Sequence, residues 1–179
     1  MNRKQLTEQL SQYKAFNDIE EGMRIRMLAF VEKHEDCFER SLLIGHVTAS
    51  CWVVNASRDK VLLIDHVKLK KWLQPGGHCD GDQNTLRVAL KELKEETGIV
   101  PTDVSLDIFD IDIHLIPKTK SIPEHEHFDL RYLFVADLKQ KIIQNHETNA
   151  IKWIRLQNLD RMTREESILR MKSKTRATQ

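Results

Sequence analysis

The sequence predicts an α/β fold in which a mixed β-sheet is covered by helices on both sides, with a helical extension at the N-terminus. Two observations lead to this class: segments with strand periodicity recur along the chain, and segments with helical periodicity separate them. Their order is neither a strict βαβ repetition nor an all-β series, so the sheet should be mixed. The 179 residues suit one compact domain, with the extension over residues 1–40 and the main part over residues 41–179.

The N-terminal extension should contain two helices. Leu6, Leu10 and Tyr13 recur at helical spacing in the first of them. Asn17 can cap the second helix, and the side chain of Glu20 can bond back to this cap. The second helix should have one apolar face, formed by Ile19, Met23, Met27, Phe30 and Val31. We expect the extension to pack against the rest of the chain or to mediate a homodimer.

Two strands and a helix are expected in the middle of the chain. Residues 47–53 alternate with the period of a strand. Residues 61–64 are continuously apolar, as in a strand that is buried on both faces. A Pro-Gly-Gly sequence at residues 75–77 should break the strand region. A helical stripe follows over residues 86–97, and Gly98 should end that helix.

The last third of the chain predicts three more strands and a helix. Alternation returns in residues 110–115 and 130–134. A further strand is expected around residues 151–154. It should lead into a helix capped by Thr163, with Glu166 three residues later.

Charge and cysteine content restrict the function. With 28 Lys+Arg and 27 Asp+Glu, the net charge of +1 argues against a dedicated nucleic-acid or membrane-surface protein. Basic residues exceed acidic ones over residues 155–176, which we interpret as a solvated helix face or frayed tail rather than a docking surface for a polyanion.

The 3 cysteines form no C-x-x-C pair, and the first residues lack the apolar core of a signal peptide. We therefore expect a reducing, cytoplasmic location.

Three glutamates share one face of the helix predicted over residues 86–97. Glu92, Glu95 and Glu96 stand at positions i, i+3 and i+4, which are neighbours on a helix surface. Their carboxylates repel one another unless a positive group lies among them. Lys91 and Lys94 flank them, so an ordinary charged surface helix is one interpretation.

A double glycine immediately before that helix favours a metal site instead. Gly76 and Gly77 allow the backbone to approach a ligand closely. Carboxylates and backbone carbonyls are the ligands of hard cations such as Mg²⁺ or Mn²⁺. Such a cation, with positions open to water and phosphate oxygens, supports phosphoryl chemistry because it polarises phosphorus and lowers the pKa of the attacking water.

Residues 77–99 resemble the Nudix box, the signature motif of the Nudix hydrolase family. The motif is Gly, five residues, Glu, seven residues, then Arg-Glu-apolar-x-Glu-Glu-x-Gly-apolar. The matching residues are Gly77, Glu92, Leu93, Glu95, Glu96, Gly98 and Ile99. Gln83 stands in place of the first Glu of the motif, and Lys91 in place of its Arg. Lysine carries the same charge as arginine but lacks its bidentate fork, and the glutamine removes one negative charge from the acidic patch.

The resemblance implies a fold and a chemistry. The Nudix fold is an α/β/α sandwich that would span roughly residues 40–170, and its enzymes use Mg²⁺ to direct water at a diphosphate joined to another group. By resemblance, Glu95 and Glu96 bind the metal together with the carbonyl oxygen of Gly77. Glu92 would be either a further metal ligand or the base that activates water.

A glutamate outside the motif is another candidate for the catalytic base. Some Nudix enzymes take this base from a distant loop, and Glu147 lies just before the last predicted strand. A surface glutamate could equally stand at this position by chance. Relatives often place an acid nearby, at the position occupied here by Ala150.

Histidines outside the motif are further candidates. His125, His127 and Asp129 would share one face of a strand, where two imidazoles and a carboxylate can bind zinc or iron. In a loop beside the motif, they could contact substrate phosphate or act as acid and base, and a solvated polar loop is the third interpretation. His78 directly follows the double glycine and is a substrate-binding candidate. Arg131 should contact phosphate or form a surface ion pair.

These observations predict a hydrolase that uses Mg²⁺ to cleave a nucleoside diphosphate linked to another group, or a similar small diphosphate. Two alternatives stay open. Gln83 and Lys91 would suit a catalytically weak module that binds a ligand or regulates. An isomerase of the isopentenyl-diphosphate type shares the fold and would need a catalytic cysteine, for which Cys79 is the candidate.

Overall fold

The structure is a computed structural model that describes residues 1–146 and 148–177. Its helices are α1 (Arg3–Gln12), α2 (Asp18–Lys33), α3 (Thr85–Thr97), α4 (Leu159–Met162) and α5 (Glu166–Ala177), with a 3₁₀ turn at Leu156–Asn158. Its strands are β1 (Gly45–Val54), β2 (Lys60–His66), β3 (Lys71–Leu73), β4 (Gly76–His78), β5 (Asp103–Ile116), β6 (His125–Val135) and β7 (Thr148–Arg155). Within the described residues, no helix has the length and apolar character needed to cross a membrane.

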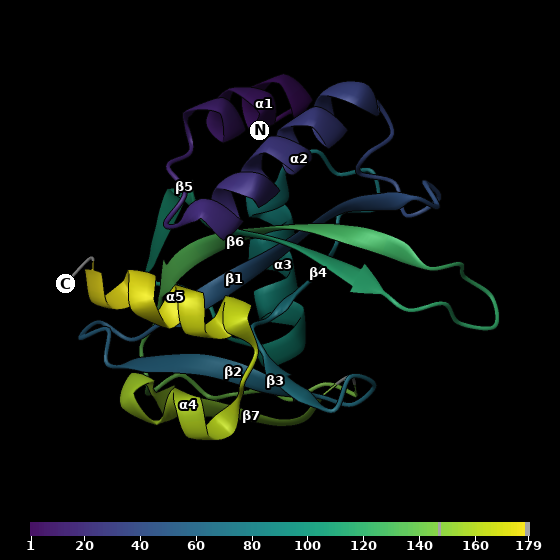
Figure 1. Ribbon diagram of the computed structural model, residues 1–179. Helices are drawn as coiled ribbons and strands as arrows, with labels where there is room; N and C mark the ends of the chain where they lie inside the picture. Colours follow the sequence, from purple (N-terminus) through teal and green to yellow (C-terminus); the bar gives the residue numbers. More distant parts are fainter. Residues whose placement is uncertain (147, 178–179) are drawn as a thin grey trace.

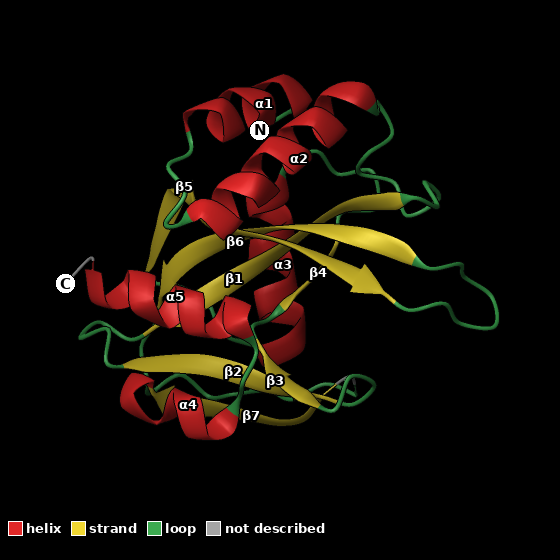
Figure 2. Cartoon of the chain, in the orientation of Figure 1, coloured by secondary structure: helices red, strands yellow, loops and turns green. Residues whose placement is uncertain are grey.

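The strands form the mixed sheet that the sequence predicts. β3, β2, β1, β6 and β5 lie side by side in that order, while β4 also pairs with β1 and β7 with β2. β1 and β6 run parallel in an unbroken register, whereas the other pairs are antiparallel. Helix α3 lies behind the sheet in the view of Figure 1 and α5 lies in front of it. Figure 2 shows the same arrangement as helices on both sides of a central layer of strands.

Strand β1 separates two apolar cores, because every one of its residues is buried. The larger core contains its alternate residues Val47, Ala49, Cys51 and Val53, together with side chains of α1, α2 and α3. Trp52 and Val54 point to the opposite side and join a smaller core with Ile168 and Met171 of α5. We call these two sides of the sheet the α3 face and the α5 face.

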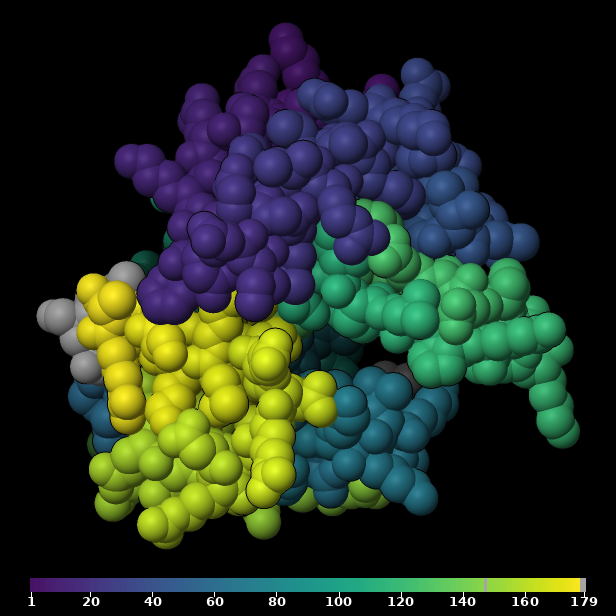
Figure 3. All heavy atoms as spheres, viewed as in Figure 1, coloured from purple at the N-terminus to yellow at the C-terminus, as the bar shows by residue number. Residues whose placement is uncertain are grey.

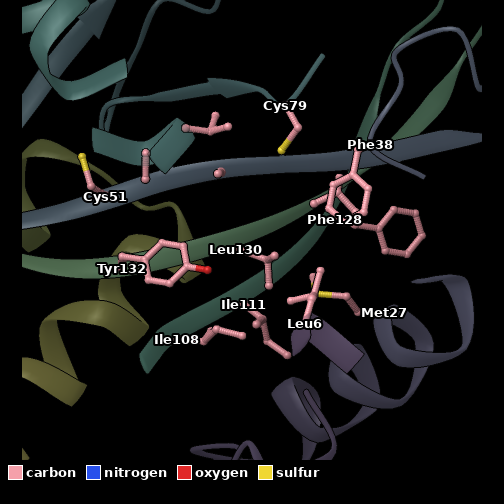
Figure 4. Packing of buried hydrophobic residues seen from close by; sticks show 14 of the residues in the cluster. Leu6, Met27, Phe38, Cys51, Cys79, Ile108, Ile111, Phe128, Leu130 and Tyr132 are labelled. Carbon is pink, nitrogen blue, oxygen red and sulfur yellow. The ribbon is translucent and has the colours of Figure 1, made fainter. Parts of the chain in front are cut away.

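The N-terminal extension packs onto the α3 face. Figure 4 shows Leu6 of α1 and Met27 of α2 beside Ile111 and Leu130 of the sheet. This contact confirms the expectation that the extension packs against the rest of the chain. The side chain of Asn17 caps α2, as predicted.

Two details of helix α2 differ from the prediction. The carboxylate of Glu20 does not bond back to the cap; it accepts a hydrogen bond from the N–H of Phe16 and is buried. Ile19 was expected on the apolar face of α2 but is exposed. Both differences arise because the start of α2 faces the buried charges of α5 described below, so Glu20, not Ile19, occupies the inward position.

Two predictions fail at the ends of elements. Gly76 and Gly77 do more than break a strand: they form β4, which pairs with Ala49 and Ser50 of β1. A Cβ on Gly76 would collide with the side chain of Ser50, so this close pairing requires glycine. Thr163 does not cap α5; it ends α4, and its hydroxyl accepts the N–H of Glu165.

A network of buried charges joins α2, β5, β6 and α5. Asp110 of β5 accepts hydrogen bonds of 2.9 and 2.8 Å from Arg170. It also lies 3.2 Å from Arg131 and 2.7 Å from Lys174, which in turn pairs with Glu20. Arg170 and Lys174 are therefore buried, and the prediction of a solvated basic face is wrong for this side of α5. The network fixes α5 over one end of the sheet. The histidines described in the next section lie at the other end of the α5 face.

Candidate active site

Helix α3 is anchored so that its polar side faces β4. Val88 and Leu93 hold its apolar side in the larger core. Asn84 caps the first turn by accepting the N–H of Arg87. Gly98 ends the helix as predicted, in the left-handed conformation with φ 72°. The two ends of the helix are thus fixed, and the glutamates project from a rigid element.

Two of the three glutamates contact the double glycine. The N–H of Gly76 donates a hydrogen bond of 2.9 Å to Oε2 of Glu96, which is buried. A Cβ added to Gly77 would lie 2.7 Å from the carboxyl carbon of Glu92, so only glycine lets the strand approach this carboxylate so closely. The third, Glu95, is the most open, with 57% of its side chain exposed.

Lys91 lies among these carboxylates. Its Nζ is 3.8 Å from Glu92 and 3.7 Å from Glu95. A positive group therefore balances the repulsion on this helix face, as the sequence analysis required. Carboxylate oxygens next to the backbone of Gly77 form the kind of donor set that a hard divalent cation prefers. The residues present thus fit such an ion.

The loop before α3 is held by the N-terminal extension. Gln83, which departs from the family motif, accepts a hydrogen bond of 2.9 Å from the backbone N–H of Arg3 at the start of α1. Asp80 pairs with Arg40 through both carboxylate oxygens. The N–H of Gly81 donates to the carbonyl of Phe38 at 3.0 Å. The change from Glu to Gln at position 83 thus coincides with a docking contact that the sequence analysis did not anticipate.

We predict opposite effects for two replacements of Gln83. Q83L removes the acceptor for the N–H of Arg3 and should lower the free energy of unfolding by about 0.5–1.5 kcal/mol. Q83E keeps the acceptor and adds a negative charge at the N-terminus of α1, so it should be neutral or stabilising by up to about 1 kcal/mol. Urea unfolding of both variants tests this, with Q157L at an exposed position as the control. Equal destabilisation by Q83L and Q83E would contradict the assigned contact.

Five histidines gather on the α5 face, near the start of β6. His46 of β1 pairs in register with His127 of β6, which pairs with His114 of β5. The His127 ring centroid lies 4.8 Å from that of His46 and 4.9 Å from that of His78, and the His46 and His125 centroids are 5.0 Å apart. The structure therefore brings together the predicted His78, His125 and His127. It adds His46 and His114, which the sequence analysis missed.

Burial keeps three of these imidazoles, His46, His78 and His127, neutral. It lowers the pKa of His127 to about 2, and neighbouring histidines add to this shift. It lowers the pKa of His78 to about 4, where Arg40 adds to the shift and Asp80 offsets part of it. Burial also lowers the pKa of His46, although the backbone of Leu42 offsets part of this. At neutral pH the rings of His46, His78 and His127 therefore offer N–H donors and nitrogen lone pairs rather than positive charge.

Asp129 and Arg131 are fully engaged inside the protein. Asp129 accepts hydrogen bonds of 3.0 and 2.8 Å from the hydroxyls of Thr48 and Ser50. Arg131 is 2% exposed and pairs with Asp129 as well as with Asp110. The sequence analysis expected a phosphate contact or a surface ion pair for Arg131; the structure shows a buried ion pair, because α5 covers this part of the sheet.

Three other candidates have different outcomes. Glu147 lies outside the described residues. Ala150 belongs to β7, where it pairs with Asp65 of β2. Cys79 is buried in the larger core, and burial raises the pKa of its thiol well above the ordinary value. A thiol in this environment lacks the exposure and thiolate character of a catalytic cysteine, so the structure does not support the isomerase alternative.

The surface has a hollow on the side of the molecule that Figure 3 shows. In Figure 3 a hollow opens between the β5–β6 hairpin, coloured green, and the segment around β2 and β3, coloured blue. Helix α5, coloured yellow, borders it from below and to the left.

The structure is a mixed sheet between helices, with a Gly-Gly strand and a glutamate helix beside its central strand. This combination is the one that the resemblance to the Nudix box implies. The NUDIX domain model matches residues 45–172, and the chain belongs to the Nudix family. The match starts at the first residue of β1, so α1 and α2 lie before it.

Curated relatives match about half of the chain. A probable DHNTP pyrophosphohydrolase from Lactococcus lactis is 35% identical over 77 residues, which are 42% of this chain and 46% of that protein. The phosphatase NudJ of Escherichia coli is 32% identical over 96 residues, which are 53% of this chain and 56% of NudJ. This chain therefore spans about half the length of the curated relatives it matches.

Solved structures share the fold. An Ap4A hydrolase binary complex from C. elegans aligns with a TM-score of 0.60 and 18% identity, over 74% of this chain and 96% of that one. The NUDIX domain of Shewanella oneidensis NrtR, complexed with ADP ribose, aligns with a TM-score of 0.58 and 20% identity, over 74% and 86% of the two chains. At these identities the likeness concerns the fold alone.

Proposed function

We propose that this protein hydrolyses the diphosphate bond of a nucleoside diphosphate linked to another group, or of a similar small molecule, with Mg²⁺ or Mn²⁺. The observation that carries the proposal is the convergence of Glu92, Glu95 and Glu96 on one helix face, beside a double glycine, in a chain of the Nudix family. The names of two curated relatives, a pyrophosphohydrolase and a phosphatase, support the reaction class.

The residues around the double glycine have distinct roles in this proposal. Glu92, Glu95, Glu96 and the carbonyl of Gly77 would hold the divalent ion. When bound, such an ion neutralises phosphate charge and lowers the pKa of a water molecule. The hydrogen bond from Gly76 keeps Glu96 in one orientation, which pre-organises the site.

Proton transfer and substrate contact fall to other groups. Glu92, or Glu147 from outside the described residues, would accept the proton of the attacking water. His78 adjoins Gly77 and would donate a hydrogen bond from its neutral ring to a phosphate oxygen. We propose a cytoplasmic location for this reaction, since the three cysteines are free and buried.

The proposal predicts metal-dependent turnover. Purified protein, tested against nucleoside diphosphate sugars, dinucleoside polyphosphates and nucleoside triphosphates, should release a monophosphate or phosphate with Mg²⁺ and not with chelator. E95Q should need more Mg²⁺ for its half-maximal rate, because one carboxylate charge is lost, while the exposed E32Q should behave like wild type. Equal activity and equal Mg²⁺ dependence of wild type and E95Q would remove the mechanism.

A second candidate is a Nudix-fold module that binds a ligand without turning it over. The observations that favour it are the pairing of Lys91 with two of the glutamates and the use of Gln83 to dock α1. It predicts saturable binding of a panel compound, measured by calorimetry, with no product after prolonged incubation. Product formation that depends on Glu95 would exclude it.

A further inference from the structure

We infer that His46, His125 and His127 form a second metal site, separate from the glutamates, that binds a divalent transition-metal ion of the zinc class. One ligand atom of each of these three side chains lies within 4.8 Å of the others. β1 and β6 hold them in an unbroken parallel register, so their relative positions are fixed by the sheet. A site built on strands keeps the precise geometry that metal binding needs better than one built on loops.

The strongest sign of a missing ligand is His46. This side chain is 3% exposed, and neither of its ring nitrogens makes a hydrogen bond of normal geometry within the described residues, although the backbone of Leu42 lies close to the ring. Nε2 of His127 is likewise buried and without a partner there. Buried polar atoms are nearly always paired, because an unpaired one loses its bonds to water without replacement. A metal ion at the centre of the cluster would take one of the two ring nitrogens of His46 and a nitrogen of His127.

Hydrogen bonds orient two further rings of the cluster, those of His125 and His114. Nδ1 of His125 lies 2.9 Å from the carbonyl of Pro123, so this nitrogen carries the proton and Nε2 keeps the lone pair. Nδ1 of His114 lies 3.2 Å from Asp112, which places a carboxylate–imidazole pair at the edge of the cluster. Metal-binding histidines characteristically donate their second N–H to a carbonyl or carboxylate in this way.

The ligand type decides which ion fits. Imidazole nitrogens suit zinc and its neighbours among the transition metals, whereas Mg²⁺ prefers oxygen. Three protein ligands are the number found in catalytic zinc sites, which leave a fourth position open. The ring centroid of His78, which directly follows Gly77, is 5.1 Å from that of His46. The two sites would therefore adjoin while selecting different metals.

The test measures zinc binding without substrate, so it is independent of hydrolysis. Tag-free protein of residues 1–179 is stripped with a chelator and titrated with Zn²⁺ by calorimetry, and Co²⁺ substitution reports nitrogen coordination by its visible absorption. We expect one ion per chain. H127A should weaken zinc binding by more than the roughly 10–100-fold cost of losing an outer-shell partner. H46F, which keeps an aromatic ring in the core, should do the same, and zinc should raise the melting temperature of wild type but not of H46F.

Two controls separate this site from the glutamates and from folding. H34A removes a histidine outside the cluster, and E92Q/E95Q disables the proposed Mg²⁺ site; both should bind zinc like wild type. Circular dichroism establishes that each variant is folded. The inference is overturned if wild type binds no zinc, if folded H46F and H127A retain wild-type affinity, or if E92Q/E95Q loses the ion. None of these outcomes bears on Mg²⁺-dependent hydrolysis, which is tested separately.

Discussion

D110N is expected to lower the free energy of unfolding by about 3–5 kcal/mol, the usual cost of removing one partner from a buried charge network. Asp110 is fully buried and faces three cations, Arg131, Arg170 and Lys174. Asparagine has nearly the shape of aspartate but no charge. The three buried cations would then lack the negative charge that balances them. Urea unfolding followed by circular dichroism measures the effect.

D160N is the matched control. Asp160 also pairs with a lysine of α5, Lys172, but 59% of its side chain is exposed. Lys172 is buried, but the water around Asp160 screens this pair, so D160N should lose only about 1 kcal/mol. If D110N cost no more than D160N, the buried network would not be what fixes α5 to the sheet.

The same network predicts how stability depends on pH. Burial raises the pKa of Asp110 and of Asp112, but hydrogen bonds and the charges of Arg131 and Arg170 outweigh it and hold both pKa values below the ordinary range. The unfolded chain therefore binds these protons at higher pH than the folded protein does. The stabilisation is fully present above the ordinary aspartate pKa of about 3.9 and is lost as the pH falls toward the lower folded values. D110N should accordingly show a shallower loss of stability in acid than wild type.

Local features of this fold were predictable from sequence because they depend on neighbouring residues. The spacing of Glu92, Glu95 and Glu96 places them on one helix face whatever the rest of the chain does, and Gly98 ends that helix on its own conformational preference. The apolar run of β2 likewise identified a strand buried on both faces.

The failures at His46, Arg131 and the basic residues of α5 share one physical cause, which is packing between distant segments. His46 has no local pattern that marks it, and only the parallel pairing of β1 with β6 sets it beside His127. The basic residues of α5 looked like a solvated face because their partners Glu20 and Asp110 lie far away in sequence. Arg131 was expected to contact phosphate or to form a surface ion pair, because nothing in its own strand shows that α5 covers it. Periodicity shows which residues share one face of a helix or strand. Which other element packs on that face depends on the whole fold.

E92Q is expected to cause the largest loss of activity, a fall in kcat of about 10²–10⁴-fold if Glu92 is the base that accepts the proton of water. Glutamine has nearly the same shape, so the close approach to Gly77 should survive and the variant should fold. Steady-state kinetics at saturating Mg²⁺ measure the change, since excess metal compensates for weaker metal binding. K94Q, at an exposed position of the same helix, should leave kcat unchanged.

The comparison of E92Q with E95Q separates a base from a ligand. If a variant has lost only a metal ligand, more Mg²⁺ should partly restore its kcat. If it has lost the base, more Mg²⁺ should not restore kcat, because a bound ion does not replace the group that accepts the proton of water. Lys91 sharpens the contrast, since its Nζ lies close to both carboxylates and keeps one of them as a partner in either variant. If excess Mg²⁺ restored E92Q to wild-type kcat, Glu92 would be a ligand, and the proton would have to go to another group, for which Glu147 is the candidate.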